Sequence, residues 1–394
     1  MTRDWLQNPD IQAFMEEHHK ADLAALALKK SPDPDWPYIQ ILAQMAARRK
    51  AEGKVPGWLA VPGLAMPPAD TMEQASSLPT AVYKTSLVAG KTFIDLTCGG
   101  GVDSYAFASA GWRGVAVERD EALAGVLADN FALLCPGALE VKAGAAEDVL
   151  PGLPKADLIL LDPQRREGAK KGLYRLEDGS PNVMELLPIL REKARFVLLK
   201  TGPLLDIATA LAALPCVAEV HCVELGGECK EVLYLLDFEV APATPVLTAA
   251  ALAEDVKSLS FTLAEEQVCE PRIGPVQNYL FEPGPAFLKS GAFKLLAARY
   301  GLYKLGPHTH LYTGGADCPE FPGRRFKVQG LIQARKEAVR AVIPSLKANL
   351  AIRNFPGSVA DLRKTLGLAE GGDDYMFACT LENGAKMLIH AHKV

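Results

Sequence analysis

The sequence predicts an α/β protein built around a doubly wound, mostly parallel sheet. Three observations support this fold class. Short apolar runs alternate with helical segments over residues 92–239, a glycine-rich turn follows the first run, and the last two runs are close enough to form a hairpin. We therefore expect seven strands, at residues 93–96, 114–118, 139–142, 156–162, 194–200, 220–224 and 231–238.

Other regions flank this core on both sides. Apolar spacing predicts helices over residues 5–30 and 38–52, so we expect an N-terminal helical region at 1–88 before the α/β domain at 89–243. Residues 242–252 are rich in Pro, Ala and Thr and predict a linker. Two small α+β domains are expected beyond it, at residues 256–320 and 321–394.

The first small domain is expected to hold strands at 259–263, 279–281 and 303–312 and a helix at 285–300. In the second we expect strands at 325–329, 348–353, 375–380 and 386–390, with helices at 334–341 and 359–366.

Bulk composition sets limits on the class of protein. With 394 residues, of which 49% are hydrophobic and 23% charged, the chain is long enough for two or three globular domains. The start lacks an apolar signal region, and no run approaches the roughly 18 apolar residues of a membrane span, so we expect a cytoplasmic protein without a membrane partner. Eight cysteines without a C-x-x-C pair suggest reduced packing residues.

Charge is unevenly distributed along the chain. Residues 320–394 contain 12 Lys and Arg against 7 Asp and Glu, a net +5, so the formal charge of −5 leaves −10 for the rest. A basic terminal domain on an acidic body is the arrangement expected when one module binds a polyanion such as RNA. Scattered solvated lysines explain the same count equally well.

The glycine-rich turn is the first candidate site. Asp95 ends the first strand, Gly99, Gly100 and Gly101 follow, and a helix begins after them. Glycine has no Cβ to block a ligand, and the N–H groups of the following helix suit a polar or anionic group. Helix–sheet packing alone is the alternative explanation of these glycines.

A second acid extends the pattern. Glu118 ends the second strand, 23 positions after Asp95, where a carboxylate can bind both hydroxyls of a ribose. A dinucleotide fits the same layout. However, Asp95 precedes the glycines, an order that resembles Rossmann-type S-adenosylmethionine-dependent methyltransferases and favours a sulfonium cofactor. The candidate cofactor-binding residues are Asp95, Thr97, Cys98, Gly99, Gly101, Asp103, Glu118, Arg119, Ala146 and Glu147.

The last two of these follow the third strand, where the adenine would lie. Alanines occupy the places at which many related sequences have Asp, so the backbone near Ala146, together with Glu147 or Asp148, would contact the base. Glu147 and Asp148 equally suit the first turn of a helix, where acids oppose the helix dipole.

The fourth strand runs directly into Asp162-Pro163, the candidate catalytic pair. Such a carboxylate can accept hydrogen bonds from an exocyclic amine and direct its lone pair toward the donated methyl group, so that catalysis is largely positioning. Termination of the strand is the simpler explanation. Amino-group methyltransferases of bases usually have Pro-Pro-aromatic after the acid, whereas Gln164 and Arg165 stand here; Tyr174 is a possible substitute.

Basic and polar residues near these motifs are candidates for substrate binding. Arg165 and Arg166 suit phosphate, and residues 321–327 interleave basic and aromatic side chains. Solvated surface charge, and a turn entering an edge strand, are the respective alternatives. Lys84 follows Ser76, Ser77 and Thr80, which suit either a lid over the cofactor or a helix N-cap. The candidates are Gln164, Arg165, Arg166, Lys84, Arg324 and Arg325.

Two other kinds of chemistry are disfavoured. No cysteine follows the fourth or fifth strand, which argues against a covalent intermediate. His308 and His310, like His390 and His392, have the spacing that places two imidazoles on one strand face, but the sequence shows no third ligand beside either pair. We therefore expect no metal.

The motifs together resemble a bacterial class I S-adenosylmethionine-dependent methyltransferase family with ferredoxin-like and THUMP-like domains at the C-terminus. The residues that carry the resemblance span about residue 50 to the end. They are Glu73-Gln74, Ser76-Ser77, Thr80-Ala81, Tyr83-Lys84, Asp95-Leu96-Thr97 with Gly99 to Asp103, Asp162-Pro163, Arg165-Arg166, residues 228–231, Glu282-Pro283, residues 289–291, residues 311–313 and residues 321–324. The sequence departs in having Thr97-Cys98-Gly99-Gly100 where relatives tend to have Thr-Gly-Gly-Phe.

The resemblance implies an S-adenosylmethionine-dependent methyltransferase with a ferredoxin-like domain at residues 256–320 and a THUMP-like domain at 321–394. By analogy with THUMP modules it implies an RNA substrate, rRNA or tRNA, with methylation of a base amino group as the expected reaction. Two alternatives stay open: a small-molecule or protein methyltransferase, and a non-catalytic RNA-binding protein on the same scaffold. The sequence does not indicate the oligomeric state.

Overall fold

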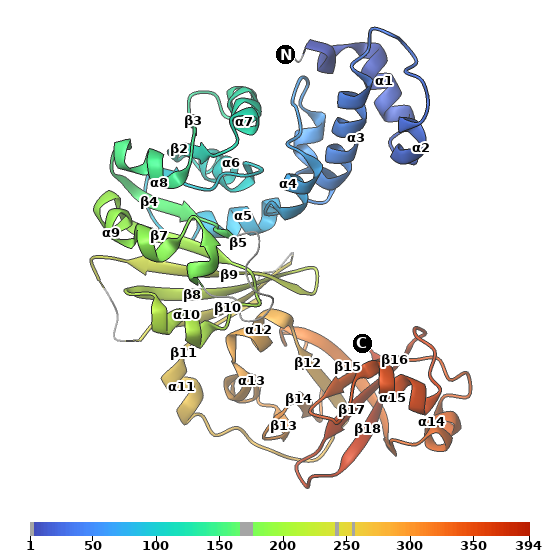
Figure 1. Cartoon of the computed structure of the whole chain (residues 1–394). Helices are drawn as coiled ribbons and strands as arrows, with labels where there is room; N and C mark the ends of the chain where they lie inside the picture. Colours follow the sequence, from blue (N-terminus) through green and yellow to red (C-terminus); the bar gives the residue numbers. More distant parts are fainter. Residues whose placement is uncertain (1–3, 166–175, 241–243, 254–256) are drawn as a thin grey trace. The chain divides into compact units, whose positions relative to one another are not determined.

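The protein is described by a computed structural model that covers residues 4–165, 176–240, 244–253 and 257–394 (Figure 1). These residues form two compact units. The first comprises Met1–Ala218 and Leu233–Pro242, and the second comprises Glu219–Val232 and Ala243–Val394. In the described part of the chain, no helix is both long and apolar enough to cross a membrane.

The first unit begins with the expected helical region. Asn8 accepts hydrogen bonds from the N–H groups of Asp10 and Ile11 and so caps the first helix, as Asp22 caps the second. Trp58 and Met72 pack in one hydrophobic cluster with Val102, so the region rests on the helix after the glycine turn. The elements are η1 Asp4–Gln7, α1 Pro9–Glu17, α2 Leu23–Ala27, α3 Tyr38–Glu52, η2 Pro56–Ala60, α4 Ala69–Gln74 and α5 Leu78–Thr85.

A doubly wound sheet forms the centre of this unit. Seven of the nine strands in this sheet follow the order β8-β9-β7-β4-β1-β2-β3, with parallel pairing from β7 to β3. The chain runs from β1 outward through β2 to β3 and then crosses back to β4 on the other side of β1, which creates a switch point where ligands bind in such sheets. The strands are β1 Thr92–Asp95, β2 Arg113–Glu118, β3 Leu139–Ala143, β4 Ala156–Leu161, β7 Ala194–Thr201, β8 Val217–Leu225 and β9 Glu228–Asp237.

The intervening helices are α6 Val102–Ser109, α7 Glu121–Leu134, α8 Ala146–Val149, η3 Leu150–Gly152, η4 Leu176–Asp178, α9 Val183–Lys193 and α10 Ile207–Ala213. Two short strands, β5 Gln164–Arg165 and β6 Gly179–Ser180, pair antiparallel beyond the end of β4. The predicted fold class and the hairpin β8–β9 are confirmed. The sheet has nine strands where seven were predicted, because β10 (Val246–Leu252) and β11 (Lys257–Thr262) extend it beyond β8. The boundary between the two units falls within this hairpin.

In the second unit, the predicted linker over residues 242–252 is wrong. Residues 246–252 form β10 (Val246–Leu252), which pairs parallel with β8 and antiparallel with β11 (Lys257–Thr262). Leu247, Ala249 and Ala250 are buried. The alanine-rich composition that suggested a linker therefore supplies small apolar side chains for a packed strand.

A seven-stranded sheet forms the rest of this unit, with the order β13-β14-β12-β15-β18-β17-β16. One sheet thus spans both expected small domains. Its strands are β12 Tyr279–Pro283, β13 Tyr303–Gly306, β14 Thr309–Gly314, β15 Gly323–Gln333, β16 Asn349–Arg353, β17 Asp374–Thr380 and β18 Lys386–Lys393, and the helices are α11 Leu263–Val268, α12 Pro285–Ser290, α13 Phe293–Arg299, α14 Lys336–Val342 and α15 Val359–Leu366.

Three further expectations for this unit were wrong. The helix expected over 285–300 is two helices, because Gly291 between them adopts a φ of +83° that ends α12. The strand expected over 303–312 is the hairpin of β13 and β14. The edge strand considered for residues 323 onward is β15, an interior strand between β12 and β18 that buries Phe326.

Asn130 on α7 fixes the loop that precedes α4. It is buried, its Nδ2 donates to the carbonyl of Ala65 over 2.7 Å, and its Oδ1 accepts from the N–H of Ala65 over 3.1 Å. We expect Asn130→Ala to lower the free energy of unfolding by about 2–4 kcal/mol, because both backbone groups lose buried partners. Urea denaturation measures this change. Leu133→Ala, at a half-exposed site on the same helix, should change it by no more than about 0.5 kcal/mol, and equal effects of the two substitutions would contradict the assignment.

Candidate functional site

A cavity opens at the carboxyl ends of β1, β4 and β7, on one side of the switch point. It collects residues that the sequence had assigned to separate motifs. Three carboxylates and two lysines face it beside apolar strand ends; its lining is Lys84, Asp95, Thr97, Asp103, Leu160, Leu161, Asp162, Leu198 and Lys200. Because charged groups of both signs line this cavity at the strand ends, we take the cavity as the candidate functional site.

Lys84 and Asp103 form a buried ion pair on one wall. The Lys84 Nζ lies 2.8 Å from Asp103 Oδ1 and also donates to Ser76 Oγ, which in turn donates to Asp103 Oδ2 over 2.8 Å. Burial alone raises the pKa of Asp103, but the ammonium groups of Lys84 and Lys200 outweigh it and hold the pKa below the usual value. Asp103 is therefore ionised, and Ser76 serves this network rather than a helix cap.

Asp95 lies deeper than the other carboxylates. Its Oδ2 accepts from Ser104 Oγ over 2.6 Å and its Oδ1 accepts from the N–H of Thr97 over 3.1 Å. Burial, reinforced by the nearby charge of Asp103, raises the pKa of Asp95 to about 7. This carboxyl therefore changes charge near neutral pH, when its neighbour Asp103 is already ionised.

Asp162 directly follows the carboxyl end of β4 and pairs with a lysine on β7, the neighbouring strand in the sheet. Its carboxylate binds Lys200 Nζ, and its backbone N–H donates to Thr97 Oγ1 over 2.7 Å. The Asp162 side chain is 41% exposed, whereas that of Lys200 is 16% exposed. The carboxylate thus remains accessible to a second donor while Lys200 fixes its position.

Glu118, at the end of β2, is hydrogen-bonded to the backbone of the glycine turn. Its Oε2 accepts from the N–H of Gly99 over 2.9 Å, and its Oε1 accepts from the N–H of Asp120 over 3.0 Å. Gly99 has a φ of +52°, and a Cβ built on it would meet nothing closer than the Thr97 carbonyl oxygen at 3.8 Å. The turn is open to a ligand at Gly99.

The other two glycines serve packing. A Cβ on Gly100 would lie 2.8 Å from Ala75 Cβ, and one on Gly101 would lie 2.8 Å from Leu127 Cδ2. Gly101 also requires its φ of +79° to begin α6. The packing explanation of the glycines therefore holds for these two positions, whereas Gly99 fits the ligand explanation.

The remaining cofactor candidates lie in differing surroundings. Cys98 is buried in a cluster with Leu127 and Phe131, so only its backbone can face a ligand. Arg119 is exposed beyond the end of β2. Ala146 is buried and Glu147 exposed at the start of α8, where the dipole explanation of Glu147 applies equally.

The candidate substrate residues divide among several places. Lys84 is in the cavity wall, and the side chain of Gln164 lies 3.3 Å from that of Gln74 on α4. Pro163 is buried behind Asp162. Of Arg165 only the backbone, in β5, is described, and Arg166 and Tyr174 lie outside the described residues.

Arg324 and Arg325, on β15 of the second unit, are already paired with acids. Arg324 Nε donates to the buried Glu282 over 2.7 Å, and Arg353 binds the other oxygen of Glu282 over 2.6 Å. Arg325 pairs with Asp317. Much of the positive charge expected at residues 321–327 is therefore balanced within the unit.

Lys200 lines the cavity although no sequence motif had indicated it as a site residue. The signal was present, because Lys200 lies at the end of the fifth strand, and parallel strands that neighbour each other bring their carboxyl ends together. Ser104 was not assigned either, although it follows the glycines at the start of α6.

The predicted C-terminal domains are confirmed by comparison with known families. Residues 279–322 match a ferredoxin-like domain family, and residues 323–393 match a THUMP domain-like family. The crystal structure of a presumed methyltransferase from Porphyromonas gingivalis W83 aligns with 100% of this chain and 99% of its own, at 28% identity and a TM-score of 0.86. Two proteins of Mycobacterium tuberculosis, from strains CDC 1551 and H37Rv, are each named an uncharacterised S-adenosylmethionine-dependent methyltransferase; each is 22% identical over 302 residues, 76% of this chain and 80% of the relative.

Asp95 gives a testable pH dependence of stability. Its pKa is about 7 in the folded chain against an ordinary 3.8, so the folded state keeps a proton that the unfolded state releases above about pH 4. The stabilisation is complete below pH 3.8 and is lost as pH rises to about 7. Asp95→Asn cannot release this proton. We expect the variant to exceed the free energy of unfolding of the parent protein by only about 1 kcal/mol near pH 4.5, and by up to about 4 kcal/mol at pH 8.

Urea unfolding at the two pH values provides the measurement. Asp103→Asn is the matched control, because it removes an ionised partner of Lys84 and should be destabilising at pH 8. Parallel stability curves for the parent and Asp95→Asn would contradict the assignment.

Proposed function

We propose that this chain transfers a methyl group from S-adenosylmethionine to an exocyclic amino group of a base in RNA. The class of enzyme is plain: the chain is an S-adenosylmethionine-dependent methyltransferase, in agreement with its full-length structural likeness to the P. gingivalis protein and its M. tuberculosis relatives. The RNA base as substrate is our proposal. The observation that carries it is the accessible Asp162 carboxylate, held by Lys200 beside the cavity.

The cavity suits the cofactor. Asp95 and Asp103 offer carboxyl groups for an ammonium group, and Glu118 presents its carboxylate at the end of β2, where a ribose binds in sheets of this topology. Gly99 leaves space at the turn between them. The bound cofactor supplies an activated methyl group on a sulfonium centre, so the protein has no need to generate a reactive group.

The residues of this chain then do the positioning. Asp162 accepts a hydrogen bond from the amine of the base, which turns the nitrogen lone pair toward the methyl group. Lys200 and the backbone contact to Thr97 hold Asp162 in place. The amine nitrogen loses one of its protons once it is methylated, and the exposed side of Asp162 opens to water that can carry the proton away.

Two features support RNA as the substrate. Residues 323–393 match the THUMP domain-like family, and residues 320–394 carry a net charge of +5. Positive charge favours RNA through release of counterions from the phosphates. One observation favours the alternative of a small-molecule or protein substrate: Arg324 and Arg325 are engaged with Glu282 and Asp317.

Asp162→Ala tests the catalytic assignment. Methyl transfer should fall at least 100-fold, because the amine loses its acceptor, while cofactor affinity should change less than about threefold. Labelled S-adenosylmethionine, RNA from cells lacking this protein, and nucleoside analysis give the rate and the product. Glu140→Ala, at an exposed site on β3, should retain the parent rate, and transfer that survives in Asp162→Ala would overturn the assignment.

Salt dependence of RNA binding tests the substrate class. We expect filter binding to weaken steeply with salt, and Arg335→Ala and Arg340→Ala, both exposed near α14, each to reduce the slope of log K against log salt by about 1. Lys142→Ala, on β3 of the first unit, is the control and should leave the slope unchanged. A slope near zero for the parent chain would refute RNA as substrate, and tight RNA binding without cofactor binding would favour the non-catalytic alternative.

A further inference from the structure

The strand pair β17–β18 brings together three side chains that the methyl-transfer site does not use. His390 and His392 are two residues apart on β18 and therefore lie on one face of the strand. Asp374 begins β17 and is the direct cross-strand partner of His392, while Met376 is the partner of His390. The antiparallel register thus places a carboxylate beside the two imidazoles.

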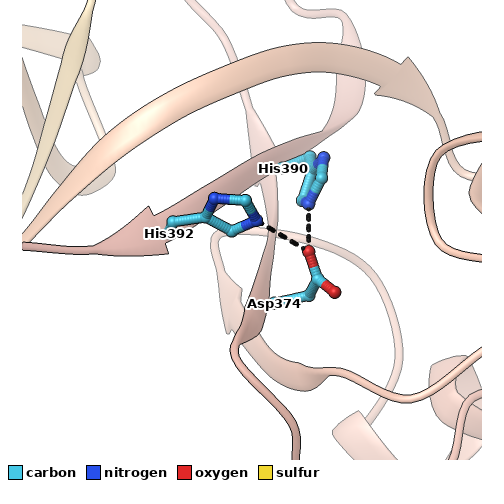
Figure 2. Close-up of side chains that lie close together, drawn as sticks. All are labelled: Asp374, His390 and His392. Atoms are coloured by element: carbon cyan, nitrogen blue, oxygen red, sulfur yellow. Dashed lines mark hydrogen bonds and ion pairs between the residues drawn. The ribbon is translucent and has the colours of Figure 1, made fainter.

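Figure 2 shows that both rings direct a nitrogen toward the same carboxylate. His390 Nε2 lies 2.6 Å and His392 Nε2 lies 2.9 Å from Asp374 Oδ1 (Figure 2). The rings stand at 89° with centroids 5.3 Å apart, so they converge at the nitrogens instead of stacking. Throughout the part of the chain that the structure describes, these side chains are the one group of three or more His, Cys, Asp or Glu close enough to share an ion.

We propose that Asp374, His390 and His392 bind a divalent transition metal ion, with zinc as the expected occupant. Two imidazoles and one carboxylate make a donor set that suits zinc and its first-row neighbours, whereas magnesium and calcium favour oxygen donors. Zinc bonds of about 2.0–2.1 Å in a tetrahedron separate neighbouring donors by about 3.3 Å. The two imidazole–carboxylate separations are slightly shorter than this, and all three donor atoms lie within 4.8 Å of one another, so small side-chain movements would admit the ion.

Exposure of the three side chains is compatible with entry of an ion. The side chain of His390 is 10% exposed and that of Asp374 is 27% exposed, while that of His392 is 49% exposed. The three side chains are therefore mostly buried at His390 and accessible to solvent at His392. Three protein donors leave a coordination position for water, as in zinc sites that are not fully enclosed by protein.

The second pair of histidines provides an internal comparison. His308 lies before β14 and is exposed, and His310 stacks on Phe293 with ring centroids 3.6 Å apart. Burial, with the nearby charge of Lys304, lowers the pKa of His310 to about 4. The same sequence spacing therefore gives a packing contact here and a convergent donor group on β18.

The test uses the full-length chain, freed of any histidine tag, treated with chelator and desalted. Titration with Co²⁺, followed by its visible absorption, and with Zn²⁺ by calorimetry should show one saturable site per chain. His392→Ala and Asp374→Asn should each weaken the affinity at least about tenfold, because each removes one donor. Zn²⁺ should also raise the melting temperature of the parent chain and not that of His392→Ala, since the ion clips β17 to β18.

His308→Ala is the matched control, because it removes a histidine of the other pair, and its binding should equal that of the parent. Circular dichroism checks that each variant is folded; since His392 is half-exposed, its replacement should leave the metal-free melting temperature nearly unchanged. The proposal is overturned if the parent shows no saturable binding of Co²⁺ or Zn²⁺ below about 100 μM, or if both cluster variants bind as the parent does.

Discussion

The buried ion pair between Lys84 and Asp103 is the contact on which the cavity depends. Lys84 comes from α5 and Asp103 from the first turn of α6, so the pair holds the N-terminal helical region against the glycine turn. Removal of one partner from such a pair leaves an uncompensated buried charge, at a cost of about 3–5 kcal/mol. The charge fixed on Asp103 also helps to keep Asp95 protonated near neutral pH. One contact thus joins two parts of the fold and sets the charge of the site.

Both explanations of the glycine-rich turn prove to be partly right, at different residues. Gly100 and Gly101 are required because α4, α7 and the loops around them pack directly on the backbone, which a Cβ would prevent. Gly99 faces open space and donates its N–H to Glu118. A turn of this kind therefore satisfies two demands: close packing fixes the start of α6, and the remaining glycine leaves the strand ends accessible.

The sequence predicted the sheet of the first unit well because its strands are short, apolar and bounded by turns. It failed at β10, where Ala249 and Ala250 lack the β-branched character of a typical strand and are stabilised by burial between β8 and β11. In the site, strand-end acids such as Asp162 were found because parallel strands end at one edge. Lys200 was missed because its pairing with Asp162 joins neighbouring strands that are separated by a whole helix in sequence.

The same limitation explains why a metal was not expected from the sequence. The third donor, Asp374, lies 16 residues before His390, a separation that matches no local ligand motif. Only the antiparallel register of β17 and β18 brings the carboxylate opposite His392. In the other pair, His310 stacks on Phe293 at the start of α13, and His308 is exposed before β14. Spacing of two residues on a strand fixes the direction of two imidazoles, but the neighbouring strand decides whether they can act as ligands.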